Sequence, residues 1–175
     1  RDLKEKGLAH IPEDRQRMGL VTEFKAHENL IFGYHHQEPY SKSSILQEKE
    51  IMSFSKKVME EYDVRPTSPN LITSNFSGGN QQKIILSREL NENPKVLLIG
   101  QPTRGVDIGA IEFIHQRLID MRDKGAAILL VSVELEEVLS LSDRIVVMFD
   151  GNIVGEKINK DVTDRDLGLL MAGVA

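Results

Sequence analysis

Uninterrupted apolar runs alternate with longer stretches of mixed polarity in the second half of the 175-residue chain. Val96–Ile99 and Ala126–Val133 are short, predominantly apolar runs with the length of buried strands. Gly78–Asn91 and Ile108–Lys124 instead place apolar residues at helical spacing. Apolar strands separated by helices are typical of a parallel sheet that is covered on both faces. The pattern therefore predicts an α/β fold.

Shorter elements are expected on either side of these segments. Pro12 ends the apolar run Leu8–Ile11, which predicts a strand that runs into a loop. Thr163 opens a capping-box sequence, so a last helix should begin there and continue through Met171. The other expected elements are a helix at Glu134–Leu141 and two strands, Ile145–Phe149 and Asn152–Glu156, joined by a hairpin turn at Asp150-Gly151.

The stretch from Gly19 to Asn93 differs from the rest because it is polar and helical and contains no convincing strand. Helices are expected at Glu28–Tyr34 and Ile45–Tyr62, with a linker at Gln37–Ser44 between them. We interpret this stretch as a helical subdomain inserted into a sheet-bearing lobe. The expected division is 1–18 for the end of the first part of the lobe, 19–93 for the helical subdomain, and 94–175 for the remainder, including the hairpin and the last helix.

Composition narrows the class of function. Lys and Arg number 22 against 27 Asp and Glu, a net charge of −5, and 5% of residues are aromatic, which argues against nucleic-acid binding by general attraction or base stacking. The absence of cysteine excludes disulfides, cysteine-ligated metals and a thiol nucleophile. The longest wholly apolar run, Ala126–Val131, is far shorter than the roughly 20 residues of a membrane helix. Because the sequence begins at Arg1, without an initiating Met or an apolar signal-peptide segment, we expect the chain to be a piece of a longer protein.

The first candidate phosphate site is Ser77-Gly78-Gly79, at the expected start of a helix. Paired glycines let backbone N–H groups approach an anion, and the N-terminus of a helix carries a partial positive charge. The Ser77 hydroxyl can either bond the anion or simply cap the helix. Taken alone, these three residues favour a capped loop. The surrounding sequence, Asn75–Lys83, and its spacing from the next motif favour a phosphate site instead.

The second candidate site follows the expected strand Val96–Ile99. In a P-loop ATPase, an aspartate after such a strand holds Mg²⁺ and a neighbouring acid orients the attacking water. In this sequence those two positions are Gly100 and Gln101. Glycine has no side chain with which to bind Mg²⁺, and glutamine cannot take a proton.

Together these motifs resemble the nucleotide-binding domain of an ABC transporter, from just before the Q-loop to its C-terminus. Ser77–Lys83 matches the signature motif in the form found in simple-sugar and nucleoside importers. Pro102–Asp107 matches the segment after Walker B together with the D-loop. Pro12–Arg15 matches the Q-loop region of the second nucleotide-binding domain of those proteins, with Glu13 at the Q-loop position. The implied fold is a P-loop NTPase-like (RecA-like) parallel sheet lobe with an inserted helical subdomain, its N-terminal part missing.

The resemblance divides the residues between two ATP sites, because each ATP of an ABC dimer lies between the Walker motifs of one half and the signature helix of the other. Gly100 replaces the Walker B aspartate, Gln101 the catalytic glutamate and Val133 the switch histidine. No Walker A sequence is present in the chain. The signature residues Ser77, Gly78, Gly79 and Gln81 serve the opposite site and are intact. Gly105, Val106 and Asp107 are the D-loop residues, and Asp107 can act across the dimer, cap the helix that begins at Ile108, or do both. A lopsided pair is expected, with the degenerate site in this half.

By resemblance, the protein is an ATPase subunit of a bacterial importer for simple sugars or nucleosides, with ATP and Mg²⁺ as cofactors of the full-length dimer. The expected partners are a second nucleotide-binding domain, in the first half of the same polypeptide, and transmembrane permease subunits that face Glu13–Tyr62; no nucleic acid is expected. The expected location is peripheral, on the cytoplasmic face of the plasma membrane. With no intact catalytic group or metal ligand, the chain by itself should be inactive. Two alternatives stay open: a non-transport ABC protein of translation or repair, and a regulatory module that binds nucleotide without turnover.

Overall fold

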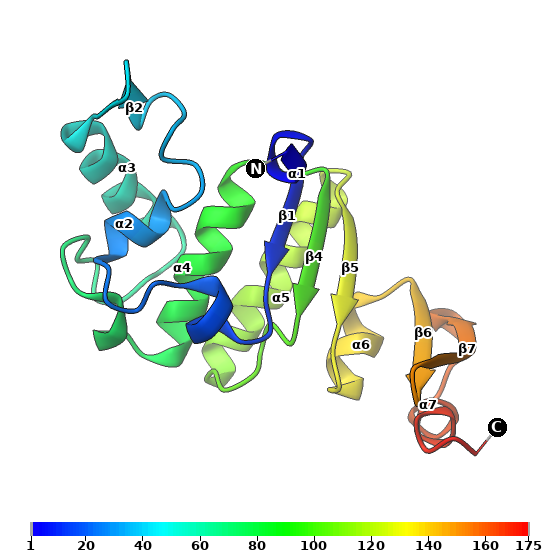
Figure 1. The fold of residues 1–175 in the computed structure, drawn as a ribbon. Helices are drawn as coiled ribbons and strands as arrows, with labels where there is room; N and C mark the ends of the chain where they lie inside the picture. Colours follow the sequence, from blue (N-terminus) through cyan, green and yellow to red (C-terminus); the bar gives the residue numbers. More distant parts are fainter. Residues whose placement is uncertain (1, 175) are drawn as a thin grey trace. The chain divides into compact units, whose positions relative to one another are not determined.

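The computed structural model describes residues 2–174, which divide between Leu129 and Leu130 into two units. Strands β1 (Leu8–Ile11), β4 (Val96–Gly100) and β5 (Ala127–Val131) form a sheet in the order β1-β4-β5, and the boundary between the two units falls within β5. β1 and β4 are parallel over their whole length, and the arrows of all three strands point the same way in Figure 1. The predicted parallel α/β arrangement is confirmed.

Helix α4 is the centre of the first unit. It packs against β1 and against three other helices, and its residues Ile84, Ile85 and Leu86 have no exposed surface. Its bounds, Gly78–Asn91, are those predicted from the sequence. The other helices of this unit are α1 (Asp2–Glu5), α2 (Ala26–Leu30), α3 (Glu48–Glu61) and α5 (Ile108–Asp123). Within residues 2–174, none of the helices is both long and apolar enough to cross a bilayer.

A buried network of charges holds the C-terminal half of α4. The Glu89 carboxylate accepts hydrogen bonds from Lys4 Nζ (2.7 and 2.9 Å), from Arg88 Nε (2.8 Å) and from the Tyr34 hydroxyl (3.1 Å). Glu89 is 1% exposed, and a buried carboxylate is stable only when it is paired in this way. Burial, followed by the charge of Glu89, raises the pKa of Tyr34, which therefore remains a hydrogen-bond donor. The network joins α4 to α1 and to the turn after α2.

The expectation that helices cover both faces of the sheet is wrong for the described residues. Ala9, Ile11, Leu97 and Ile99 point to one face and are at most 1% exposed. On β5, in contrast, Leu129 and Val131 are 61% and 54% exposed. The apolar sequence of a strand indicates that the strand is suited to burial. It does not indicate whether the helix that would pack on it belongs to the same stretch of chain.

The helical stretch contains a small hairpin that the sequence pattern did not predict. Ser41–Lys42 (β2) pairs antiparallel with Ile45–Leu46 (β3), and Ser43 and Ser44 form the turn with positive φ. The predicted helix at Ile45–Tyr62 therefore begins three residues late, at Glu48. Ile45 matches the helical spacing by sequence but is 67% exposed, so it does not belong to the buried helix face. The proposed subdomain limits at residues 18 and 93 remain a prediction.

The second unit is built from a hairpin and two helices. Strands β6 (Arg144–Phe149) and β7 (Asn152–Ile158) are antiparallel, with the predicted turn at Asp150-Gly151. Helices α6 (Leu135–Leu141) and α7 (Asp164–Met171) pack on a core of Ile145, Val147 and Leu167. The predicted capping box at the start of α7 is confirmed, because Thr163 and Asp166 exchange side-chain and backbone hydrogen bonds.

Candidate functional site

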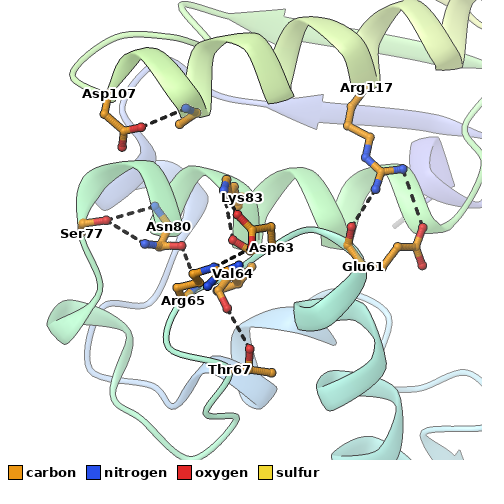
Figure 2. Close-up of polar contacts among 11 residues, drawn as sticks. Glu61, Asp63, Val64, Arg65, Thr67, Ser77, Asn80, Lys83, Asp107 and Arg117 are labelled. Atoms are coloured by element: carbon orange, nitrogen blue, oxygen red, sulfur yellow. Dashed lines mark hydrogen bonds and ion pairs between the residues drawn. The ribbon is translucent and has the colours of Figure 1, made fainter.

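The N-terminus of α4 is capped by Ser77, whose side chain is exposed. Ser77 Oγ accepts hydrogen bonds from the backbone N–H of Asn80 (3.4 Å) and from Asn80 Nδ2 (2.9 Å), as Figure 2 shows. The cap satisfies one donor of the first turn. The N–H groups of Gly78 and Gly79 have no intrahelical acceptor by helix geometry, so they are the donors that this end of α4 can present to an anion. Capping and anion binding are thus compatible here.

The two signature glycines contact the loop that follows β4. A β-carbon added at Gly78 would lie 2.9 Å from the carbonyl oxygen of Gly105, and one added at Gly79 would lie 2.9 Å from Asp107 Oδ2. Both distances are too short for real carbon–oxygen contacts. At Gly78 the obstructing atom belongs to the backbone, so glycine is required there independently of any ligand. At Gly79 a β-carbon would have to displace the carboxylate of Asp107, which caps α5.

The loop after β4 ends at Asp107, which caps α5. Asp107 Oδ1 accepts a hydrogen bond from the backbone N–H of Ala110 at 2.9 Å. Gly105 has a φ of +64°, a conformation that favours glycine. Val106 lies between them and its N–H donates to the Thr103 carbonyl at 3.3 Å. The structure thus places the predicted D-loop residues beside the predicted signature residues, within the first unit.

The loop after β1 is joined to the loop after β4 by two arginines. The Arg15 guanidinium donates to the carbonyl oxygens of Arg104 (2.6 Å) and Gly105 (3.2 Å), and the Arg104 guanidinium pairs with the Glu13 carboxylate. A β-carbon at Gly78 would also lie 2.5 Å from Arg15 Nη2. Arg15, which belongs to the predicted Q-loop region, therefore bonds the predicted D-loop residue Gly105 and lies against the predicted signature residue Gly78. The sequence reasoning did not single it out, although it belongs to the motif Pro12–Arg15.

The end of β4 lacks the groups that hold Mg²⁺ and activate water in a P-loop ATPase. Gly100 has no side chain, and Gln101, with a φ of +46°, carries a neutral amide. A β-carbon at Gly100 would meet Glu13 at 3.4 Å or more, which is ordinary contact, so the backbone leaves room for a larger residue. Among residues 2–174, no group of three or more potential metal ligands is present. The donor set at this strand end does not fit a Mg²⁺ site.

A short loop after α3 holds Asn80 from the side opposite Ser77. The backbone N–H of Arg65 donates to Asn80 Oδ1 at 2.7 Å. The loop is fixed by Asp63, whose carboxylate pairs with Arg65 Nε at 2.6 Å and with Lys83 Nζ at 3.2 Å (Figure 2). These hydrogen bonds, first to Arg65 and then to Lys83, hold the pKa of Asp63 below its usual range. Asn80 was part of the quoted motif but was not among the predicted site residues.

Two further predicted site residues differ in their surroundings, because one is buried in the first unit and the other belongs to the second unit. The amide of Gln81 points into the protein, where Nε2 donates to the carbonyl oxygens of Thr73 and Phe76, each at 3.2 Å, and the residue is 3% exposed. Its assignment to ATP stays a prediction. Val133 belongs to the second unit, between β5 and α6, and is 62% exposed. Its position relative to a nucleotide also stays a prediction.

Comparison with known proteins places these motifs among importer subunits. No protein-family model matches the chain. The chain is 46% identical over 173 residues to the guanosine import ATP-binding protein NupO of Bacillus subtilis (strain 168), which is 99% of this chain and 34% of that protein. Identity and coverage are the same for the nucleoside import ATP-binding protein NupA of Lactococcus lactis subsp. cremoris (strain MG1363). The chain thus spans about a third of the length of the curated relatives that it matches.

Solved structures of ATP-binding cassettes share the fold. MJ1267, an ATP-binding cassette of an ABC transporter, superposes with a TM-score of 0.73 at 25% identity, over 97% of this chain and 70% of that chain. A dimeric post-hydrolysis structure of the cassette MJ0796, bound to ADP and Pi, gives a TM-score of 0.70 at 23% identity, over 90% of this chain and 67% of that chain.

Proposed function

Since the chain belongs to the ATP-binding cassette family of ABC transporters, alongside nucleoside and sugar import ATP-binding proteins, we propose that it is the signature-donating half of an importer's ATPase. In this role Ser77, Gly78 and Gly79 bind the γ-phosphate of ATP held by a second nucleotide-binding domain. Its own strand end, at Gly100 and Gln101, does not support hydrolysis. The fold that carries these motifs is the P-loop NTPase fold of the cassettes.

The observation that carries the proposal is the contrast between the two loops of the first unit. At the start of α4, the exposed Ser77 hydroxyl lies beside the N–H groups of Gly78 and Gly79, which have no intrahelical acceptor, at the positive end of a 14-residue helix. At the end of β4, the carboxylates needed for Mg²⁺ and for water activation are missing. Loss of a general base alone commonly costs about 10²–10⁴ in rate. Hydrolysis in the complete importer is therefore assigned to the site that this half completes.

The remaining parts of the proposal concern the whole protein. The partner is a second nucleotide-binding domain, the first half of the same polypeptide, and the dimeric cassette MJ0796 supports pairing of this kind. ATP with Mg²⁺ is bound at the shared site. Permease subunits contact residues 13–62, and the protein lies on the cytoplasmic face of the plasma membrane without crossing it. The cargo is a nucleoside, because nucleoside import relatives reach 46% identity whereas a glucose and a ribose relative reach 35% and 34%.

The test compares two substitutions in the full-length importer. Ser77→Arg places a long side chain where the phosphate binds, and loss of such a site is expected to lower ATP hydrolysis by at least about 10²-fold. Gln101→Ala removes a residue of the degenerate site and should leave hydrolysis within about twofold. Ser74→Arg is the matched control, because it adds the same side chain at an exposed position three residues earlier.

Three results would decide against this reading. Equal losses from Ser77→Arg and Gln101→Ala would show two working sites and overturn the lopsided pair. Retention of full hydrolysis in Ser77→Arg would remove the signature role itself. Tight nucleotide binding by the wild-type importer without any turnover would indicate a regulatory module in place of a transport ATPase.

A further inference from the structure

The Ser77 hydroxyl receives two hydrogen bonds from the chain and gives none to the groups that supply them. Its partners are the backbone N–H of Asn80 and the amide Nδ2 of Asn80, at 3.4 and 2.9 Å. A hydroxyl has one proton to donate and two lone pairs with which to accept. When both lone pairs are occupied, its proton has to point away from them, into the solvent-facing side of the loop.

This arrangement depends on which end of the Asn80 amide faces Ser77, and the structure fixes that choice. The other end of the amide lies 2.7 Å from the backbone nitrogen of Arg65. A backbone N–H can only donate, so the atom that it contacts is the amide oxygen. The NH₂ group therefore points to Ser77, and the direction of the Ser77 hydrogen bond follows from chemistry alone.

The loop that supplies the Arg65 N–H is itself held against α4. Lys83 lies three residues after Asn80 on the same helix and is 8% exposed. Its Nζ bonds the Asp63 carbonyl oxygen at 3.0 Å and the Asp63 carboxylate at 3.2 Å. It also lies 4.9 Å from the centre of the Phe113 ring. The loop is thus attached to α4 at two points, which keeps the Arg65 N–H in line with Asn80 (Figure 2).

We propose that Asn80 is a positioning residue that sets the polarity of Ser77, so that the hydroxyl acts as a donor to an anionic phosphoryl oxygen. The inference rests on the signature role proposed above and adds the direction of the hydrogen bond. A hydroxyl–oxyanion hydrogen bond is charge-assisted and stronger than a neutral one. A hydroxyl that is free to rotate would spend part of its time with a lone pair facing the phosphate, and the negative phosphate oxygen repels that lone pair.

The test is a double-mutant cycle in the full-length importer. Asn80→Ala removes the donor and should lower the rate of ATP hydrolysis about two- to tenfold, the value of one hydrogen bond. In a Ser77→Ala background the same substitution should change the rate by less than about twofold, because no hydroxyl remains to be oriented. Asn80→Asp keeps the shape and the contact with Arg65 but offers Ser77 an acceptor. Its loss should be at least as large as that of Asn80→Ala.

Asn91→Ala and Asn91→Asp are the matched controls, since Asn91 is the last residue of α4, far from Ser77. Thermal unfolding of each variant is measured alongside the rates. If Asn80→Ala lowers the rate equally with and without Ser77, Asn80 acts structurally and the polarity role is wrong, while the signature role stands. If Ser77→Ala alone has no effect, the signature role fails first. If Asn80→Ala does not fold, the cycle is completed with Asn80→Asp, which retains the fold-preserving shape.

Discussion

The start of α4 and the end of β4 both carry glycine in motifs proposed to serve nucleotide chemistry, but for different physical reasons. At Gly78 and Gly79 a β-carbon would collide with the Gly105 carbonyl and the Asp107 carboxylate. At Gly100 a β-carbon would meet only ordinary contacts with Glu13. The first two glycines are fixed by packing, whereas the third reflects missing chemistry. A glycine in a phosphate-binding motif is therefore informative only when its surroundings are known.

The largest effect is expected from Gly78→Ala, which disturbs the close contact between Gly78 and Gly105. The added methyl has to displace the backbone of Gly105 as well as Arg15, and overpacking of this kind typically costs about 1–3 kcal/mol. The free energy of unfolding, measured by urea denaturation, should fall by that amount, and hydrolysis by the full-length importer should fall with it.

Gly109→Ala is the control for that experiment. A β-carbon at Gly109, in the first turn of α5, would lie 3.5 Å from Asp107 Oδ1, an ordinary contact. Because alanine is the better helix former, this substitution should be neutral or stabilise the chain by up to about 1 kcal/mol. Equal stability of Gly78→Ala and Gly109→Ala would show that the Gly78 contact does not constrain the loop.

A smaller effect is expected from Asp63→Asn, which weakens the ion pairs that hold the loop after α3 against α4. The pKa of Asp63 is lowered by its bonds to Arg65 and Lys83, so its pairing stabilises the fold above the ordinary aspartate range and is lost as the pH falls through the lowered value. Since Asp63 is about half exposed, the loss at pH 7 should be about 0.5 kcal/mol or less. Urea denaturation at several pH values should show this difference shrinking below pH ~4.

Asp150→Asn serves as its control, because Asp150 has a similar φ of +47° and lies exposed in the β6–β7 turn. A difference for Asp63→Asn that stays constant down to pH ~3 would contradict the assignment to the titrating carboxylate.

The smallest effect is expected at the end of β4, from the double substitution Gly100→Asp and Gln101→Glu. A β-carbon at position 100 meets only ordinary contacts, and glutamate has nearly the shape of the glutamine that it replaces, so the free energy of unfolding should change by less than about 0.5 kcal/mol. Hydrolysis by the full-length importer should stay within about twofold, because the position predicted for the switch histidine still carries Val133. A rise of several-fold would show that these two positions alone keep the site silent. A large loss of stability would show that Gly100 is needed for packing after all.

The regular elements were predictable because burial leaves a periodic signal in the sequence. The bounds of α4 and the positions of strands β1 and β4 follow from apolar spacing and run length, whereas their pairing with each other was not predicted. The β2–β3 hairpin escaped prediction because two-residue strands are too short to show alternation. The exposure of Leu129 and Val131 escaped it because strand composition does not say what covers a strand.

The residues of the candidate site could be predicted where the type of side chain and its position indicate its role. Ser77 and Asp107 were identifiable as caps because their residue types and positions suit that role. Arg15 and Asn80 were not, since both act on backbone groups, the carbonyls of residues 104 and 105 and the N–H of residue 65. Every residue type carries a backbone carbonyl and every type except proline a backbone N–H, so a sequence gives no sign of which of these groups are in reach.

Because α4 is held near one end, a small tilt of this helix moves the residue at its other end. A helix of 14 residues is about 21 Å long, with Ser77 at one end and the buried Glu89 network near the other. A tilt of roughly 3° about the Glu89 end moves Ser77 by about 1 Å, which is comparable with the tolerance of a hydrogen bond. The position of Ser77 at the start of α4 therefore depends as much on Lys4 and Tyr34 as on the residues proposed to contact the phosphate.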